Sequence, residues 1–197
     1  MYNFYYRHLK ELYKEDIQLL YTDTDSLLFN VKTENVYEDM KLNKKVYDFS
    51  NYPENHELYS IKHKAAVGRF KDETAGNPIY EFVGLRPKMY SFITANDQKE
   101  YKKAKGVTKA VVADVIKHKQ YVECLQNSTL MKHPMRHIRS DHDHLGIYDL
   151  KKISLSPLDT KRFINKDGIT SLPFGHRDIP NQTNDVDEQC DAEIKEI

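Results

Sequence analysis

The chain has 197 residues and a mass of 23.2 kDa, the length of one ordinary domain or of two small subdomains. Its 30 basic and 30 acidic residues cancel, but the last twenty residues hold seven acids and one lysine, so the preceding 177 carry a formal charge of +6. A mildly basic body with an acidic tail is compatible with a polyanionic partner. No apolar run approaches the ~18 residues of a membrane span, and two cysteines argue against a disulfide scaffold or a cysteine-based zinc finger.

The composition also bears on the compartment and on the core. The N-terminal sequence lacks the apolar stretch and cleavage site of a secretory signal, so we expect an intracellular protein that is not secreted. The hydrophobic fraction of 39% includes 14 tyrosines. Exchanging the 14 Tyr for the 7 Gly, to match the usual apolar set, lowers this fraction to about 36%, against the roughly 45–50% of typical globular domains, which predicts a thin, tyrosine-rich core.

The first third of the chain predicts a helix followed by a hairpin. Apolar and aromatic residues at spacings of three and four predict an amphipathic helix over residues 2–14. This helix has no entry signal, so we expect the chain to be cut from a longer protein. Residues 17–30 predict a strand, a tight turn at 22–25 and a second strand. A helical turn is expected at 36–42, and an irregular polar stretch follows up to residue 66.

After residue 66 the pattern predicts mostly strands, with two helices between them. The predicted strands are residues 67–71, 80–94, 99–105, 130–139, 147–155 and 161–165. The predicted helices are residues 108–116 and 119–126. Beyond Arg177 the sequence is polar and acidic, which predicts disorder. Together these elements predict an α+β fold.

Tyr-Thr-Asp-Thr-Asp-Ser, at residues 21–26, is the most informative stretch. Asp23 and Asp25 lie two residues apart at the tip of the predicted hairpin, and alternation in an extended chain would point both carboxylates to the same side. Two such charges repel and each costs free energy to desolvate, so the pair favours a divalent cation such as Mg²⁺. A bare Asp-x-Asp is nevertheless more often an ordinary polar turn.

Two other metal-binding interpretations can be weighed. An EF-hand loop starting at Asp23 would need an oxygen donor at its fifth position and Gly at its sixth, where Leu27 and Leu28 stand, so it is excluded. A glycosyltransferase Asp-x-Asp, holding Mn²⁺ and a sugar nucleotide, stays open. Such a motif normally follows a nucleotide-binding βαβ unit, and only 16 residues precede the predicted hairpin.

Residues 21–26 closely resemble the Tyr-Gly-Asp-Thr-Asp-Ser motif in the palm of family B DNA polymerases. Thr22 stands where the family more usually has Gly. In this respect the motif resembles the protein-primed branch of the family, in which the substitution is tolerated. Downstream, Gly-Leu-Arg-Pro-Lys-Met-Tyr-Ser at residues 84–91 is similar to the Lys-x-Tyr motif of that family, which contacts the primer terminus.

The resemblance continues in order to residue 177. Lys-Ala-Lys-Gly-Val at residues 103–107, with the helices that follow, resembles the start of the thumb. Residues 159–176 resemble the end of such polymerases in viruses and in large self-synthesising transposons.

This resemblance implies a partial polymerase palm, made of a helix and an antiparallel hairpin, followed by a small mixed α/β thumb. Residues 1–95 would be the C-terminal part of the palm and 96–177 the thumb-like subdomain; residues 178–197, the acidic tail expected to be disordered from its composition, lie outside the resemblance. The implied activity is DNA-directed nucleotidyl transfer by a two-metal Mg²⁺ mechanism. The implied partners are a DNA primer-template, deoxynucleoside triphosphates, the remainder of the polymerase and a terminal priming protein. The implied location is the nucleus or the site of viral or element replication. No membrane partner is implied.

By the same resemblance, Asp25 is the principal metal ligand, and Asp23 is an accessory ligand nearer the primer end. Tyr21 and Ser26 would shape the hairpin beside that primer. The two-metal centre would be completed by a carboxylate outside this chain.

The resemblance also assigns contacts to DNA. Lys88 and Tyr90, expected two apart in one strand and facing the same way, would grip the last phosphates of the primer. Over residues 99–119 lysines outnumber acids by seven to two, which is more often a solvated face but in a thumb would track duplex phosphates. The candidate duplex contacts are Lys102, Lys103, Lys105 and Lys109, extended by Arg136 and Arg139.

Four histidines lie between His133 and His144. Their spacing does not match a zinc finger and no cysteine completes a tetrad, so we expect a solvated, DNA-facing loop.

The other palm motifs of the family do not occur in these 197 residues, neither Asp-x-x-Ser-Leu-Tyr-Pro nor Asn-Ser-x-Tyr-Gly. The exonuclease motifs and the fingers are missing as well. We therefore expect a C-terminal piece of a polymerase, inactive alone, from a truncated gene model, a decayed copy or a split gene. The alternative is a domesticated or decayed fragment that only binds nucleic acid or protein.

Overall fold

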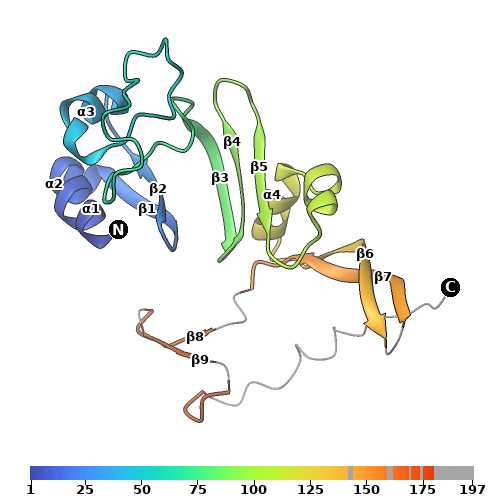
Figure 1. Ribbon diagram of the computed structural model, residues 1–197. Coiled ribbons are helices and arrows are strands. Elements are labelled where there is room, and N and C mark those ends of the chain that lie inside the picture. Colours follow the sequence, from blue (N-terminus) through green and yellow to red (C-terminus); the bar gives the residue numbers. More distant parts are fainter. Residues whose placement is uncertain (142–143, 159–161, 169, 174, 180–197) are drawn as a thin grey trace. The chain divides into compact units, whose positions relative to one another are not determined.

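The computed structural model describes residues 1–141, 144–158, 162–168, 170–173 and 175–179 (Figure 1). It is a mixed structure of short helices and small antiparallel sheets, which agrees with the predicted α+β class. The chain divides into two compact units. Unit 1 is Met1–Phe82 with Phe92–Glu100, and unit 2 is Val83–Ser91 with Tyr101–Ile197.

The predicted N-terminal helix is present, but it is not a regular α-helix. It consists of α1 (Tyr2–Phe4), the π-helical η1 (Tyr5–Leu9), α2 (Lys10–Tyr13) and the 3₁₀ turn η2 (Lys14–Asp16). Part of the apolar pattern that predicted the helix faces the core, because Tyr5, Leu9 and Tyr13 are buried, whereas Tyr2, Tyr6 and Leu12 are exposed. A π-helical turn inside a helix adds a residue to that turn, which the spacing of apolar residues alone does not reveal.

This helical segment packs on one face of the predicted hairpin. The hairpin consists of β1 (Ile17–Asp23) and β2 (Ser26–Val31), which pair antiparallel. The shared core contains Tyr5, Leu9, Tyr13 and Ile17, with Leu19, Leu27, Phe29 and Val31 packed against it. Burial of these side chains provides the main stabilisation of an otherwise two-stranded sheet, which is marginal alone.

The segment after the hairpin is a short helix and a long loop. Helix α3 (Val36–Leu42) confirms the predicted helical turn, and the side chain of Asn35 caps it by accepting from the N–H groups of Tyr37 and Glu38. Apart from the 3₁₀ turn η3 (Lys44–Val46), the loop up to residue 66 is irregular, as expected. A second core, Met40, Tyr47, Phe49, Tyr52 and Leu58, lies beneath it.

The prediction of a strand at residues 67–71 is wrong. Its one β contact in the described structure is an isolated bridge between Phe70 and Tyr47. The loop is held instead by buried side chains, since the Asp48 carboxylate accepts from the N–H groups of Ser50 and Ala65 at 2.9 and 3.0 Å. A side chain that satisfies loop backbone in this way removes the need for a strand ladder.

The single strand predicted at residues 80–94 is in fact a hairpin. Strands β3 (Ile79–Arg86) and β4 (Met89–Thr94) are separated by a turn at Pro87 and Lys88, and β5 (Glu100–Ala104) completes a sheet of order β3-β4-β5. Proline cannot donate a ladder hydrogen bond, and Lys88 has a φ of 61°, so both residues break the strand.

Unit 2 contains the helices that follow β5 and the remaining strands. They are η4 (Val111–Val115), α4 (His118–Gln126), β6 (Met131–Asp141), β7 (His144–Leu155), β8 (Arg162–Ile164) and β9 (Ser171–Pro173). The core of this unit consists of Val83, Leu85, Met89, Ala104, Ile116, Tyr121, Cys124 and Leu155. The predicted helices and strands are confirmed in their approximate places, β9 was not predicted, and the tail from residue 180 lies outside the described residues.

None of the helices in the described part of the chain is both long and apolar enough to cross a bilayer.

Candidate metal-binding hairpin and basic surface

The two carboxylates of the Tyr-Thr-Asp-Thr-Asp-Ser stretch lie at the tip of the β1–β2 hairpin. Asp23, the last residue of β1, pairs with Ser26, the first residue of β2, so the turn consists of Thr24 and Asp25 alone. The turn is thus shorter than the four residues predicted. Because Asp25 lies in the turn and not in a strand, the alternation expected between the two carboxylates does not apply.

Hydroxyl groups of the same stretch hold this tip. The Ser26 hydroxyl donates to the Asp23 carbonyl at 3.0 Å, and the Thr22 hydroxyl donates to the Ser26 carbonyl at 3.2 Å. The Thr24 hydroxyl donates to the Asp23 carboxylate at 3.2 Å. These local bonds fix the backbone that carries both carboxylates, which pre-organises the tip.

The turn carries backbone strain at its first residue. Thr24 has a φ of 52°, a conformation that Gly adopts without cost and a β-branched residue rarely adopts. Two-residue hairpin turns with a positive φ at the first position are those that favour Gly there. Strain of this kind is typical of functional sites, where neighbouring structure maintains it.

A β-bulge decides which face of the hairpin carries the functional residues. The pairing runs in register to Leu19 and Phe29 and then shifts, so that Tyr21 pairs with Leu28 and Leu20 is the extra residue. Side chains alternate along a strand, so one inserted residue moves all later side chains to the opposite face. Tyr21 and Asp23 therefore lie on the face away from the helix core, and the Tyr21 ring lies 6.3 Å from the ring of Phe82.

The tip has the donor chemistry of a hard cation site. Asp25 and Ser26 are exposed and Asp23 is half-buried, so carboxylate oxygens are open to solvent at the end of a defined hairpin. Mg²⁺ is usually held by one or two carboxylates together with water and substrate phosphates. Within the described residues no group of three or more His, Cys, Asp or Glu side chains is arranged to hold a metal.

Lys88 does not lie in a strand, which corrects the prediction that it and Tyr90 share a strand face. Lys88 is exposed in the β3–β4 turn, whereas Tyr90 is half-buried in β4. The structure instead brings Lys88 beside Lys105, because the Lys105 N–H donates to the Lys88 carbonyl at 3.1 Å. The Lys-x-Tyr stretch and the lysine-rich stretch are therefore adjacent in unit 2, although 17 positions separate the two lysines.

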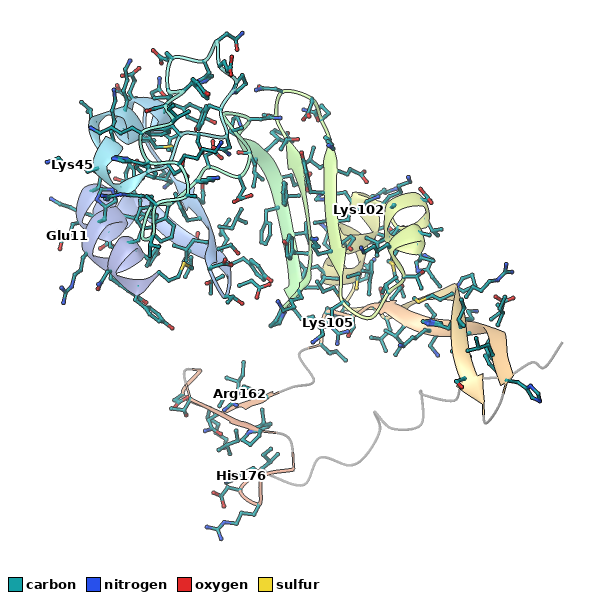
Figure 2. All side chains as sticks on the ribbon, viewed as in Figure 1. Glu11, Lys45, Lys102, Lys105, Arg162 and His176 are labelled. Carbon is teal, nitrogen blue, oxygen red and sulfur yellow. The ribbon has the colours of Figure 1, made fainter. Side chains whose placement is uncertain are left out.

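The predicted duplex-contacting lysines fall into two groups. Lys103, Lys105 and Lys109 are exposed. Lys102 is half-buried on β5 (Figure 2), and its ammonium donates to the carbonyls of Ala113 and Ile116 at 3.0 and 2.7 Å. A cation at these carbonyls stabilises the end of η4, a structural role that the sequence did not indicate.

The histidine cluster is not a loop, so that prediction is wrong. His133 and His137 lie in strand β6, His144 begins β7, and His142 lies outside the described residues. The Nδ1 atom of His133 is 2.6 Å from the Ser154 hydroxyl, which in turn donates to the Met131 carbonyl. This histidine therefore joins the two strands.

The arginines expected to extend the basic surface lie on β6. Arg136 forms an ion pair with Asp149 at 3.0 Å, which partly cancels its charge, and the Arg139 side chain lies outside the described residues.

No family model, no curated protein and no solved structure matches this chain.

Proposed function

We propose that this chain is the C-terminal part of a family B DNA polymerase of the protein-primed type, with palm residues in the N-terminal region and thumb residues after them. One observation carries the proposal. The stretch that resembles the polymerase motif folds as a hairpin whose two-residue turn holds Asp25, directly after Asp23 at the end of β1. A metal ligand at a rigid, solvent-facing tip can meet the end of a bound nucleic acid.

The proposed chemistry is nucleotidyl transfer with two metal ions. Mg²⁺, when bound, would neutralise charge on the phosphates and on the attacking 3′ oxygen. Asp25 would be the principal ligand and Asp23 the accessory ligand, held by its bonds from Thr24 and Ser26. Tyr21 and Ser26 would shape the surface beside the primer.

A second carboxylate-bearing strand is needed for this chemistry. The family motif that supplies it, Asp-x-x-Ser-Leu-Tyr-Pro, does not occur in these 197 residues. We therefore propose that the chain alone binds DNA but does not extend a primer. Lys88, Lys103, Lys105 and Lys109 would contact phosphates without reading sequence.

The first experiment measures the metal site directly. Mn²⁺ binding by the purified chain is followed by electron paramagnetic resonance, with and without a primer-template duplex. We expect Asp25→Asn to weaken Mn²⁺ binding at least about tenfold, or about 1.4 kcal/mol, and Asp23→Asn to weaken it less. Asp114→Asn, an exposed acid on η4, is the matched control and should bind as the unmodified chain does. Equal Mn²⁺ affinity in all variants would contradict the proposed metal site.

The second experiment measures the reaction. Primer extension is assayed with Mg²⁺ and all four deoxynucleoside triphosphates. Extension by the purified chain that disappears in Asp25→Ala would show a complete catalytic centre and would overturn the proposal that a second carboxylate comes from elsewhere.

The second candidate function is nucleic-acid binding without catalysis. The backbone contact between Lys88 and Lys105 favours it, because this contact brings two exposed lysines near each other and phosphate binding by lysines needs no metal. Duplex binding by an unmodified chain that shows no saturable Mn²⁺ binding would favour this candidate over the polymerase proposal.

A further inference from the structure

Charge is divided unequally between the two structural units. Unit 1 has 12 basic and 16 acidic side chains, which gives a formal charge of −4. Unit 2 up to residue 179 has 17 basic and eight acidic side chains, which gives +9. Residues 180–197, the acidic segment, lie outside the described residues and hold six acids and one lysine. The most basic part of the chain is therefore followed directly by a strongly acidic segment.

The basic charge of unit 2 is concentrated at the end of strand β5. Lys103, Lys105 and Lys109 are exposed there and together form what we call the lysine surface. The hydrogen bond from the Lys105 N–H to the Lys88 carbonyl brings a further exposed lysine near them. Like charges that lie close together repel one another, so a polyanion that binds here relieves the repulsion.

Other basic side chains of unit 2 already have acidic partners. Lys119 forms an ion pair with Glu123 at 3.4 Å, and Arg136 forms one with Asp149 at 3.0 Å. These pairs cancel part of the charge on α4 and β6. A mobile or tethered anion is therefore attracted more strongly to the lysine surface than to these side chains.

We propose that the acidic segment binds the lysine surface of its own chain and competes there with DNA. The charges are complementary, and the segment follows residue 179 of the same unit. Its 18 residues span at most roughly 60 Å when extended, which is long enough to reach these lysines. Covalent attachment gives an effective concentration in the millimolar range, so a contact too weak to form between separate molecules is populated within one chain.

The contact would tune how tightly unit 2 holds nucleic acid. Carboxylates of the segment would occupy the ammonium groups that otherwise meet phosphates, without offering base edges or an apolar face. Both contacts are electrostatic, so added salt weakens them together. The competition with DNA rests on the proposed function, whereas the contact between the segment and the lysines does not.

The first experiment detects the contact without DNA. Cys124 is buried, so a nitroxide label is attached to Cys190, within the acidic segment of the complete chain. We expect the NMR amide signals of residues 103, 105 and 109 to lose at least about half their intensity at about 20 mM salt and to recover it at about 300 mM. The amide signals of unit 1 should keep their intensity.

Two variants connect the signal loss to charge. A neutral-segment variant keeps the label and the length of the chain but replaces its six acids with amides: Asp185→Asn, Asp187→Asn, Glu188→Gln, Asp191→Asn, Glu193→Gln and Glu196→Gln. A second variant combines Lys103→Met, Lys105→Met and Lys109→Met. Neither variant should show the loss at positions 103, 105 and 109. An equal loss in the neutral-segment variant, or a loss centred on unit 1, would overturn the proposal.

The second experiment measures the competition. A fluorescent duplex of about 20 base pairs is titrated and followed by anisotropy. The neutral-segment variant should bind at least about fivefold more tightly than the unmodified chain at about 50 mM salt, and less than about twofold more tightly at about 200 mM. The matched control removes six exposed acids from unit 1 and so has the same net charge: Glu11→Gln, Glu15→Gln, Asp16→Asn, Glu34→Gln, Glu54→Gln and Glu73→Gln. An equal gain in this control would show that net charge determines the affinity and would overturn the competition.

The two experiments separate this inference from the proposed function. Signal loss at the lysine surface without duplex binding by any variant would overturn the competition and the proposed DNA binding, while supporting the contact. Unchanged signals would overturn the contact, whether or not the chain binds duplex. Signal loss found only between a labelled chain and a second, ¹⁵N-labelled chain would make the occupant the acidic segment of another copy, and would also overturn the proposal.

Discussion

Tyr21 pairs across the β1–β2 hairpin with Leu28, one residue out of step with the preceding pair of Leu19 and Phe29. The shift allows one strand to serve two purposes. Its first half buries Ile17 and Leu19 against the N-terminal helix, and its second half directs Tyr21 and Asp23 to the other face. A carboxylate on the helix face would have to be desolvated among apolar side chains, at a cost of several kcal/mol.

Replacing the strained turn residue should stabilise the protein. Thr24 has a φ of 52°, so Thr24→Gly should relieve strain and raise the free energy of unfolding by about 1 kcal/mol. The measurement is urea unfolding followed by circular dichroism.

Thr22→Gly is the matched control for this turn, and it also introduces the more usual residue of the resembled motif. Thr22 lies in β1, where its hydroxyl donates to the Ser26 carbonyl, so Gly should lower the free energy of unfolding by about 0.5–1 kcal/mol. A loss of stability in both variants would contradict the proposed strain at Thr24.

Lys102 and Lys103 are neighbours in sequence but should respond differently to substitution. The Lys102 ammonium donates to two carbonyls at the end of η4, so Lys102→Met should lower the free energy of unfolding by about 1–2 kcal/mol. Lys103 is exposed, so Lys103→Met should leave stability unchanged and weaken DNA binding. Equal stability of the two variants in urea would contradict the structural role of Lys102.

The sequence predicted those elements in which local pattern and tertiary packing agree. In the helix at the N-terminus, the β1–β2 hairpin and α3, part of the apolar pattern that predicted each element is buried, as at Leu9, Ile17 and Met40. The strand at 67–71 failed because the segment pairs with distant backbone at Phe70, whose N–H donates to the Val46 carbonyl and whose carbonyl accepts from the Asp48 N–H. Its apolar residues carry no sign of that contact.

The candidate site was predictable as a motif but not as a geometry. Asp23 and Asp25 were identified from residue types alone, whereas the bulge at Leu20 is a feature of the pairing between β1 and β2 that the residue types do not mark. The contact between Lys88 and Lys105 depends on the pairing of distant strands.

Acid should destabilise the protein through Asp48. Burial raises the pKa of this carboxyl, but the N–H groups of Ser50 and Ala65 outweigh it and hold the pKa below its ordinary value. A group with a lowered folded-state pKa contributes stability above its unfolded pKa of about 4 and loses it as the pH falls through the folded value. Asp97 acts in the same direction, because hydrogen bonds from Thr94 and Asn77 lower its pKa.

Urea midpoints between about pH 6 and about pH 3 test this expectation. The midpoint should fall below about pH 4, and Asp48→Asn should be less stable at about pH 6 and show a flatter profile. Asp114→Asn, an exposed acid, is the control and should keep the profile of the unmodified chain. An unchanged slope in Asp48→Asn would mean that other groups dominate acid unfolding.

The basic surface of unit 2 should bind duplex DNA through phosphate contacts. Each contact releases condensed counterions, so the logarithm of the affinity falls with the logarithm of salt by about 0.9 per phosphate contacted. Lys88→Met combined with Lys105→Met should therefore weaken binding and reduce that slope by about 1–2. Anisotropy titrations between about 50 and about 200 mM salt measure both quantities. Lys45→Met, an exposed lysine of unit 1 (Figure 2), serves as the control, and an equal change of slope in this variant would show that net charge, and not this surface, determines DNA binding.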